Sequence, residues 1–266
     1  MIVEIAKAKL NLALHVRARR SDGYHELETL FAFVADGDIV TVAPADADSF
    51  ALAGPFAAVL GGEGDNLVTR AARGFREAFG GGAHAITLDK RLPVASGIGG
   101  GSADAAATLR ALGRLHGVSL DALFPLADAL GSDVPACLYG VTAIGRGRGE
   151  QLEPVPGLPG VPVLLVNPGV AVSTAEVFRR WDGVDRGPLP ADPAAGRNDL
   201  EPPARAIAPV IGDVLDALAA QPGAGLVRMS GSGATCFALF DSDASRDAAA
   251  DALSARGWWM LASNLS

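Results

Sequence analysis

The segment from Leu92 to Leu112, LPVASGIGGGSADAAATLRAL, joins a glycine-rich loop to an alanine-rich helix. Glycine lets the backbone approach an anion closely, and the first helical turn adds N–H groups and the positive end of the helix dipole. Phosphate is the natural occupant of such a loop. The Walker motif requires a lysine after its last glycine, but Ser102 stands there, so the positive charge must come from another part of the chain.

Two other interpretations of this loop remain open. A dinucleotide fingerprint, GxGxxG, would need a glycine where the chain has Ser102, and glycine also serves plain connecting turns. Ser102 could cap the following helix or offer its hydroxyl to phosphate or Mg²⁺. We expect Asp104 to interact favourably with the helix dipole, with metal binding as the less favoured alternative.

Lysine is rare enough in this chain to single out candidates for the missing charge. The three lysines are Lys7, Lys9 and Lys90, and every other cationic side chain is an arginine. The segment EIAKAKLNLAL alternates with period two, which predicts a strand with Lys9 and Asn11 on one face and leucines on the other. A solvent-exposed sheet surface is the alternative interpretation of the lysine face.

The elements before the loop must deliver these residues. We predict a turn at residues 21–23, then strand pieces broken at Asp36-Gly37, and a helix over NLVTRAARGFREAFG. The segment HAITLDKRLP is predicted as the strand that leads into the glycine loop.

After the loop, an amphipathic helix is followed by a second helix that begins after Ser119 and stops at Gly131. Because Gly131 ends that helix and Pro135 opposes an immediate new one, Asp133 is predicted on a constrained connector. A turn or cap carboxylate is the alternative interpretation of Asp133.

The C-terminal part predicts a buried strand at residues 161–169, a helix with a capping box of Ser173 and Glu176, and an exposed loop over residues 183–199. A helix over about 203–220 and a strand, turn, strand, helix, strand succession complete the chain. This pattern predicts two α+β layers joined at the proline-rich segment EPVPGLPGVP, near residue 157.

Composition limits the classes of function. The chain has 266 residues and a net charge of −8, which argues against a nucleic-acid partner. No apolar run approaches the roughly 20 residues of a membrane span, so we expect no membrane partner and a cytoplasmic location. Cys137 and Cys236 are distant in sequence and suit a reducing compartment and core packing; we expect no metal site from them.

Several motifs together resemble one family. PVASGIGGGSADAA is similar to the phosphate loop P-x-x-x-G-[LI]-G-x-x-S of the GHMP kinases, the family of galactokinase, homoserine kinase and mevalonate kinase. The segments AKAKLNLAL, DGYHELETL, GSDVPACLYG, NDLE and MSGSGATCFALF resemble the members that act on a cytidine diphosphate-linked methylerythritol in non-mevalonate isoprenoid synthesis. The match runs from residue 6 to about 240 in the expected order.

The resemblance implies the two-domain GHMP kinase fold, with an N-terminal domain like the second domain of ribosomal protein S5 and a ferredoxin-like C-terminal domain. We place these domains at residues 1–157 and 158–266, with the active site in the cleft between them. It also implies ATP and Mg²⁺, transfer of the γ-phosphoryl group to the 2-hydroxyl of a small-molecule substrate, and a monomer or homodimer.

The resemblance also implies roles for individual residues. Lys9 matches the lysine of the first family motif and Asp133 the catalytic aspartate, which would accept the proton of the hydroxyl while Lys9 stabilises negative charge. The nucleotide would be bound by Asn66, Pro93, Gly97, Ile98, Gly99, Gly100, Gly101, Ser102 and Ala103. The acceptor would be bound by Asn11, Tyr24, His25, Phe178, Gly231, Ser232 and Gly233.

Some of these residues have a second interpretation. Tyr24 and His25 fall where the family recognises cytosine, although either could be an ordinary surface or half-buried residue. Phe178 could stack on the base or belong to the core of its helix, and Asn66 could simply cap a helix. Relatives usually have proline where this chain has Lys7, which leaves open which of the two neighbouring lysines enters the site.

Three competing functions are weighed against this hypothesis. Another GHMP kinase, acting on homoserine or mevalonate, would have no use for a base-binding pair. A nucleotide-binding module without catalysis would not need Lys9 and Asp133 in their motifs. An NAD-dependent oxidoreductase is the third alternative.

Overall fold

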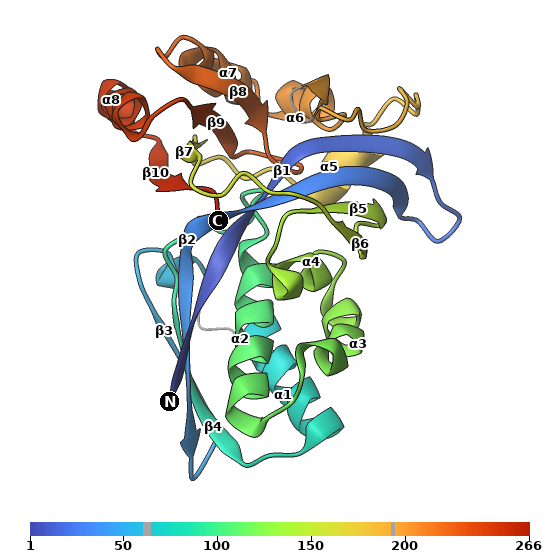
Figure 1. Ribbon diagram of the computed structural model, residues 1–266, viewed down its shortest axis with the longest axis vertical. Helices are drawn as coiled ribbons and strands as arrows, with labels where there is room; N and C mark the ends of the chain where they lie inside the picture. Colours follow the sequence, from blue (N-terminus) through green and yellow to red (C-terminus); the bar gives the residue numbers. More distant parts are fainter. Residues whose placement is uncertain (61–64, 193–194) are drawn as a thin grey trace. The chain divides into compact units, whose positions relative to one another are not determined.

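The computed structural model describes residues 1–60, 65–192 and 195–266 of the chain (Figure 1). These residues form two compact units, each built from separate stretches. Unit 1 consists of Met1–Ala8, Asp36–Val94 and Gly99–Gly140, and unit 2 of Lys9–Ala35, Ala95–Ile98 and Val141–Ser266. The long strands β1 (Ile2–Arg19) and β2 (His25–Ala45) contribute residues to both units. The boundary at 157/158 stays a prediction.

The described residues of unit 1 combine strands with four helices. Residues 39–45 of β2 pair with β4 (Ala83–Asp89) in antiparallel orientation, and β3 (Ser49–Ala53) pairs with β4 in parallel. The helices are α1 (Leu67–Phe79), α2 (Gly100–His116), α3 (Leu120–Leu130) and α4 (Val134–Tyr139), and a 3-10 turn, η1, covers Ala57–Leu60. Helix α2 contacts the other three helices through a buried face rich in alanine, which allows close packing.

Two predictions in unit 1 are wrong. Strand β2 runs through Asp36-Gly37 without a break. Gly37 is required there because a Cβ would overlap the carbonyl oxygen of Ala6, so the glycine allows close contact with β1. Pro135 does not prevent a new helix either. It lies in the first turn of α4, where a missing N–H costs nothing, and Asp133 is the N-cap.

Unit 2 contains a four-stranded antiparallel sheet in the order β10-β7-β9-β8. Its strands are β7 (Pro162–Asn167), β8 (Ala224–Met229), β9 (Cys236–Phe240) and β10 (Trp259–Asn264). Its helices are α5 (Thr174–Arg179), α6 (Glu201–Ile207), α7 (Val210–Ala219) and α8 (Asp243–Leu253), followed by a 3-10 turn, η3, over Ser254–Arg256. The succession β-α-β-β-α-β with this strand order is the ferredoxin-like arrangement, which confirms that prediction.

Further strands of unit 2 extend β2. Residues 27–31 of β2 pair with β5 (Ala143–Gly147), which pairs with β6 (Gln151–Pro154). The single helix expected over 203–220 is two helices, because Pro209 has no N–H to continue α6.

The predicted loop over 183–199 is largely irregular and exposed, although its residues 193–194 lie outside the described part of the chain.

The two cysteines are buried and are not joined by a disulfide, as expected from their apolar surroundings. Within the described residues, no helix has both the length and the apolar character needed to cross a membrane.

Candidate active site

The first half of the glycine loop, residues 95–98, packs against the turn between β8 and β9. A Cβ at Gly97 would lie 2.6 Å from the carbonyl oxygens of both Ser230 and Gly233, and Gly97 has a φ of 78°. The Ser230 hydroxyl donates to the Gly97 carbonyl at 3.0 Å, and the Thr235 N–H donates to the Ser96 carbonyl at 3.1 Å. The SGSG turn therefore lies directly against residues 95–98 of the glycine loop.

Strand β1 brings Lys9 and Asn11 to the same place. The Lys9 N–H donates to the Ile98 carbonyl at 3.0 Å, and its Nζ donates to the Asn11 Oδ1 at 3.1 Å. The Asn11 N–H donates to the Ser230 hydroxyl at 3.2 Å, while its Nδ2 donates to Thr29 Oγ1 at 2.7 Å. Lys9 and Asn11 are only 3% and 2% exposed, so the solvent-exposed interpretation of this face is wrong.

A buried ammonium needs compensation, because removing a charge from water is costly without hydrogen bonds. Besides Asn11, the Lys9 Nζ lies 4.8 Å from the centre of the Phe31 ring, a cation–π contact. Unit 2 thus holds a buried positive charge on the strand that hydrogen-bonds to the glycine loop. Lys7 is half-buried and lies in unit 1.

Asn198 holds the β8–β9 turn, a role that the sequence interpretation missed. Its Nδ2 donates to the carbonyls of Met229 at 2.7 Å and Gly231 at 2.8 Å. A Cβ at Gly231 would lie 2.8 Å from the Gly97 carbonyl, so the turn has no space for a side chain at that position. The NDLE motif that contains Asn198 was a usable signal, but a structural role could not be assigned to it from spacing alone.

Ser230 and Thr29 are also site residues that the sequence did not indicate. Each is a small hydroxyl residue within a strand or turn, a type too common to single out. Ser232, which was predicted, faces Thr174, with 2.8 Å between their hydroxyl oxygens.

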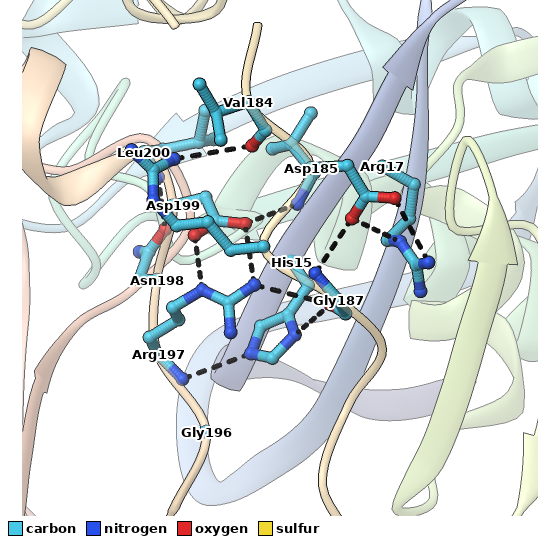
Figure 2. Close-up of polar contacts among 12 residues, drawn as sticks. His15, Arg17, Val184, Asp185, Gly187, Gly196, Arg197, Asn198, Asp199 and Leu200 are labelled. Atoms are coloured by element: carbon cyan, nitrogen blue, oxygen red, sulfur yellow. Dashed lines mark hydrogen bonds and ion pairs between the residues drawn. The ribbon is translucent and has the colours of Figure 1, made fainter. Parts of the chain in front are cut away.

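The segment before Asn198 is tied to β1 by the network in Figure 2. The Arg197 N–H donates to His15 Nε2 at 3.2 Å, so His15 carries its proton on Nδ1 and donates it to the Gly187 carbonyl at 3.0 Å. Asp199 accepts from the Val16 N–H at 2.8 Å and from Arg197 Nε at 2.7 Å. Burial lowers the pKa of His15, which favours this neutral form.

Figure 2 also shows an ion pair at the outer edge of this network. The Arg17 guanidinium contacts Asp185 at 2.8 Å and Glu28 at 3.0 Å. This surface pair is worth little in stability by itself, but it connects the exposed loop to β1.

The residues predicted to bind a base lie at the other end of β1 and β2. The ring centres of His25 and Phe178 are 4.8 Å apart, and Trp181 lies edge-on to His25 at 5.8 Å. Among the described residues, the buried His25 Nε2 has no hydrogen-bond partner. Burial, assisted by Arg19, lowers the pKa of His25, so the imidazole is neutral at pH 7.

Tyr24 is 51% exposed, and the Arg148 guanidinium lies 5.2 Å from its ring centre. Phe178 packs against the buried core of unit 2 as well as against His25. The structure therefore bears out core packing for Phe178, and its stacking on a base stays a prediction.

In unit 1, helix α2 begins directly in the glycine loop. Gly99 is its N-cap in the left-handed conformation, with a φ of 65°, and no side chain hydrogen bond caps this start in the described structure. The first N–H groups of a helix have no acceptor inside it, which leaves those of Gly100, Gly101 and Ser102 directed out of the helix. Ser102 therefore does not cap the helix, and this predicted alternative is wrong.

Asp104 does not serve the helix dipole as expected. Its side chain is buried, and its Oδ2 accepts from Lys90 Nζ at 2.6 Å; the same ammonium lies 2.5 Å from Asp38 Oδ2. Asp104 is the fifth residue of α2 and lies beyond the first turn, so it pairs with the Lys90 ammonium and not with the helix end.

The remaining predicted residues of unit 1 have structural roles. Asn66 caps α1 in a capping box with Thr69, accepting N–H donors at 2.9 and 3.1 Å. Pro93 is buried at the start of the loop. Asp133 is half-buried at the start of α4, and contact with adenine or the acceptor stays a prediction for Asn66 and Asp133.

No group of three or more His, Cys, Asp or Glu side chains with the geometry of a metal site occurs in the part of the chain that the structure describes.

Two family models match the chain. The GHMP kinases N terminal domain matches residues 66–141, and the GHMP kinases C terminal model matches residues 190–257. The first range includes the glycine loop and α2, and the second includes Asn198 and the β8–β9 turn.

Curated relatives match over nearly their whole length. A 4-diphosphocytidyl-2-C-methyl-D-erythritol kinase of Rhizorhabdus wittichii is 60% identical, with 98% of this chain and 94% of the relative covered. The enzyme of the same name from Novosphingobium aromaticivorans is 52% identical over 97% and 90% of the two chains. A crystal structure of 4-(cytidine 5'-diphospho)-2C-methyl-D-erythritol kinase matches with a TM-score of 0.86 and 39% identity, covering 100% of this chain and 99% of that one. The chain therefore belongs to the GHMP kinases, and within them to the family of 4-diphosphocytidyl-2-C-methyl-D-erythritol kinases.

Proposed function

We propose that this kinase transfers the γ-phosphoryl group of ATP to the 2-hydroxyl of 4-diphosphocytidyl-2-C-methyl-D-erythritol, giving the 2-phosphate and ADP in the non-mevalonate route to isoprenoid precursors. The observation that carries the proposal is the convergence of three motifs in unit 2. These motifs are strand β1, residues 96–98 and the β8–β9 turn, which contact one another. At Gly97 and Gly231, neighbouring carbonyl oxygens lie too close to leave space for a side chain.

The described residues fit a nucleotide triphosphate. The N–H groups at the start of α2 are not used by a capping side chain, and Gly99 to Gly101 allow phosphate oxygens to approach the backbone. ATP bound here would supply the transferable phosphoryl group. We propose that Mg²⁺ accompanies its phosphates, because this ion is commonly held by phosphates and water with few protein ligands.

Lys9 and Asp133 are proposed as the catalytic pair. Phosphoryl transfer depends mainly on positioning and on stabilising charge, with a base to accept the hydroxyl proton. Asp133 would accept the proton of the 2-hydroxyl group. The hydroxyl oxygen would form a bond to the γ-phosphorus while the bond between the γ-phosphorus and the ADP oxygen breaks. Lys9, held by Asn11, would stabilise the negative charge that develops.

His25 is proposed to read the cytosine. Its Nε2 is buried and unpartnered in the described structure, and a cytosine edge offers both donors and acceptors. Tyr24 and Phe178 would contact the two faces of the base.

A coupled ADP-release assay with three acceptors tests the substrate. We expect turnover with the cytidine diphosphate-linked methylerythritol and none above background with homoserine or mevalonate. Turnover of homoserine or mevalonate without turnover of the cytidine substrate would overturn the proposal in favour of another GHMP kinase. ATP binding without transfer to any of them would indicate a module without catalysis.

The catalytic pair is tested by Lys9→Met and Asp133→Asn, each expected to lower kcat by about 100-fold or more while an ATP analogue still binds. Lys7→Met is the matched control, because it removes a lysine two positions earlier on the same strand. Near wild-type turnover of either catalytic variant would show that its role is misassigned.

We also propose a cytoplasmic location, where ATP and small acceptors are available. Light scattering coupled to size-exclusion chromatography distinguishes the expected alternatives, monomer and homodimer.

A further inference from the structure

Lys90 is a buried lysine that the proposed mechanism does not use. It follows β4 and precedes the glycine loop, and its side chain is only 2% exposed. Its Nζ lies 2.5 Å from Asp38 Oδ2 and 2.6 Å from Asp104 Oδ2, and both aspartates are buried. All three residues belong to unit 1. They are called the Lys90 cluster below.

The cluster joins the residues that precede the glycine loop to the helix that follows it. The second oxygen of Asp38 accepts from the N–H groups of Arg91 and Leu92, at 2.6 and 2.8 Å, where the chain enters the loop. Lys90 connects Asp38 to Asp104, which lies in α2 where the chain leaves the loop. Three buried side chains therefore close the segment that carries the phosphate-binding glycines.

The ammonium also lies directly beside the first residue of α2. A Cβ at Gly100 would be 3.2 Å from Lys90 Nζ. The start of the helix thus rests on the cluster, and displacement of Lys90 would release the turn whose N–H groups are proposed to bind the phosphates.

The charges of the cluster are compatible with a neighbouring anion. Burial raises the pKa of Asp104 to about 8, with Lys90 opposing the shift and Asp38 adding to it. The Asp104 Oδ1 has no hydrogen-bond partner within the described ranges, which also disfavours a charged carboxylate. With Asp104 protonated, the cluster has no net charge, so it does not repel a triphosphate.

We propose that Lys90, Asp38 and Asp104 are positioning residues for the nucleotide phosphates, which hold the start of α2 so that the N–H groups of residues 100–102 are oriented before ATP binds. The inference rests on the proposed use of the glycine loop for ATP. A buried ion pair contributes little to stability, because the cost of desolvating the charges offsets their attraction. Its hydrogen bonds are rigid, however, so they can fix the orientation of the groups that they join.

The test compares Lys90→Met, the double variant Lys90→Met/Asp104→Asn, and Arg91→Met. Lys90→Met alone leaves two buried carboxyl groups without their cation. The double variant leaves only one ionisable carboxyl group, so it should destabilise the fold less. Arg91→Met is the matched control, because Arg91 is exposed and its ion pair is with Asp89. Calorimetry measures the Kd of a non-hydrolysable ATP analogue, kinetics measure KM for each substrate, and thermal unfolding identifies temperatures at which each variant is folded.

We expect the folded double variant to raise the Kd and the KM for ATP about tenfold, with the KM for the acceptor changed less than twofold and Arg91→Met like wild type. A folded double variant with wild-type affinity for the analogue overturns the inference, as does an equal loss in both KM values. If Lys90→Met does not fold, the Kd and KM values of the double variant still test the inference. Failure of the wild-type protein to bind the analogue would instead overturn the proposed function.

Discussion

The two ends of the glycine loop are held by different forces. At residues 95–98, hydrogen bonds between uncharged groups and close backbone contact join the loop to the β8–β9 turn. At the other end, the buried ions of the Lys90 cluster hold the start of α2. The first end should therefore be sensitive to added volume and the second to altered charge, although both belong to the segment that we propose binds phosphate.

Gly97→Ala should have the largest effect on the uncharged end. The new Cβ would meet two carbonyl oxygens at 2.6 Å with φ at 78°, which we expect to cost about 2–4 kcal/mol of unfolding free energy. Displacement of the loop should lower kcat/KM about 100-fold. Chemical denaturation and steady-state kinetics measure the two effects.

Gly257→Ala is its matched control, because Gly257 has a φ of 70° and a Cβ added there would meet no described atom within 4 Å. Only the backbone strain of about 1 kcal/mol should then appear, without loss of activity. Equal effects of the two substitutions would show that close contact at Gly97 is unimportant.

Asn198→Ala should have an intermediate effect on the same end. The variant leaves the carbonyls of Met229 and Gly231 without their donor, at a cost of about 1–3 kcal/mol, and should lower kcat/KM about tenfold by releasing the turn. Asn264→Ala is the control: its Nδ2 donates to the Gly160 carbonyl at 3.0 Å, away from the turn. That variant should lose stability and keep wild-type kinetics; parallel losses in activity would contradict the role of Asn198.

The smallest expected effect is a difference in pH dependence. His15, beside Asn198, has a pKa lowered by burial, so its contribution is present above pH 6.5 and is lost as the pH falls below it. Asp104, facing Lys90 and Asp38, has a pKa raised from 3.8 to about 8, so its contribution is present at low pH and is lost as the pH rises through that interval.

We therefore expect that chemical denaturation between pH 4 and 9 will show a smaller decrease in unfolding free energy toward acid pH for His15→Gln than for wild type. For Asp104→Asn, the decrease toward alkaline pH should be smaller than for wild type. His25 and His84 also have lowered pKa values, so both variants should still lose part of their unfolding free energy at acid pH. If the unfolding free energy of both variants depends on pH as it does in wild type, the two ends of the loop do not differ in their electrostatics.

The sequence predicted the uncharged end better than the charged one. Period-two alternation was enough to place Lys9 and Asn11 on one face of a strand, and the glycine pattern indicated that an anion can approach the backbone closely. Lys90 was noticeable only because lysine is rare. Its partner Asp38 is 52 positions away and Asp104 is 14 positions away, and no local pattern encodes such a contact.

Local rules also failed where tertiary contact decided the outcome. Gly37 suggested a break, but the carbonyl of Ala6 requires a glycine in a continuous strand. Pro135 suggested a connector, although the first turn of a helix accepts proline. The split between α6 and α7 at Pro209, by contrast, followed a rule that the sequence already contained.

The uncapped start of α2 links folding to metabolism. A helix whose N-cap is Gly99, without a capping side chain, lacks about a few tenths of a kcal/mol that a capping residue would provide. A bound phosphate would satisfy those N–H groups only in the folded protein, so nucleotide at 100 times its Kd should raise the unfolding free energy by about 2.7 kcal/mol. The supply of ATP would thus help to set how much folded enzyme a cell maintains.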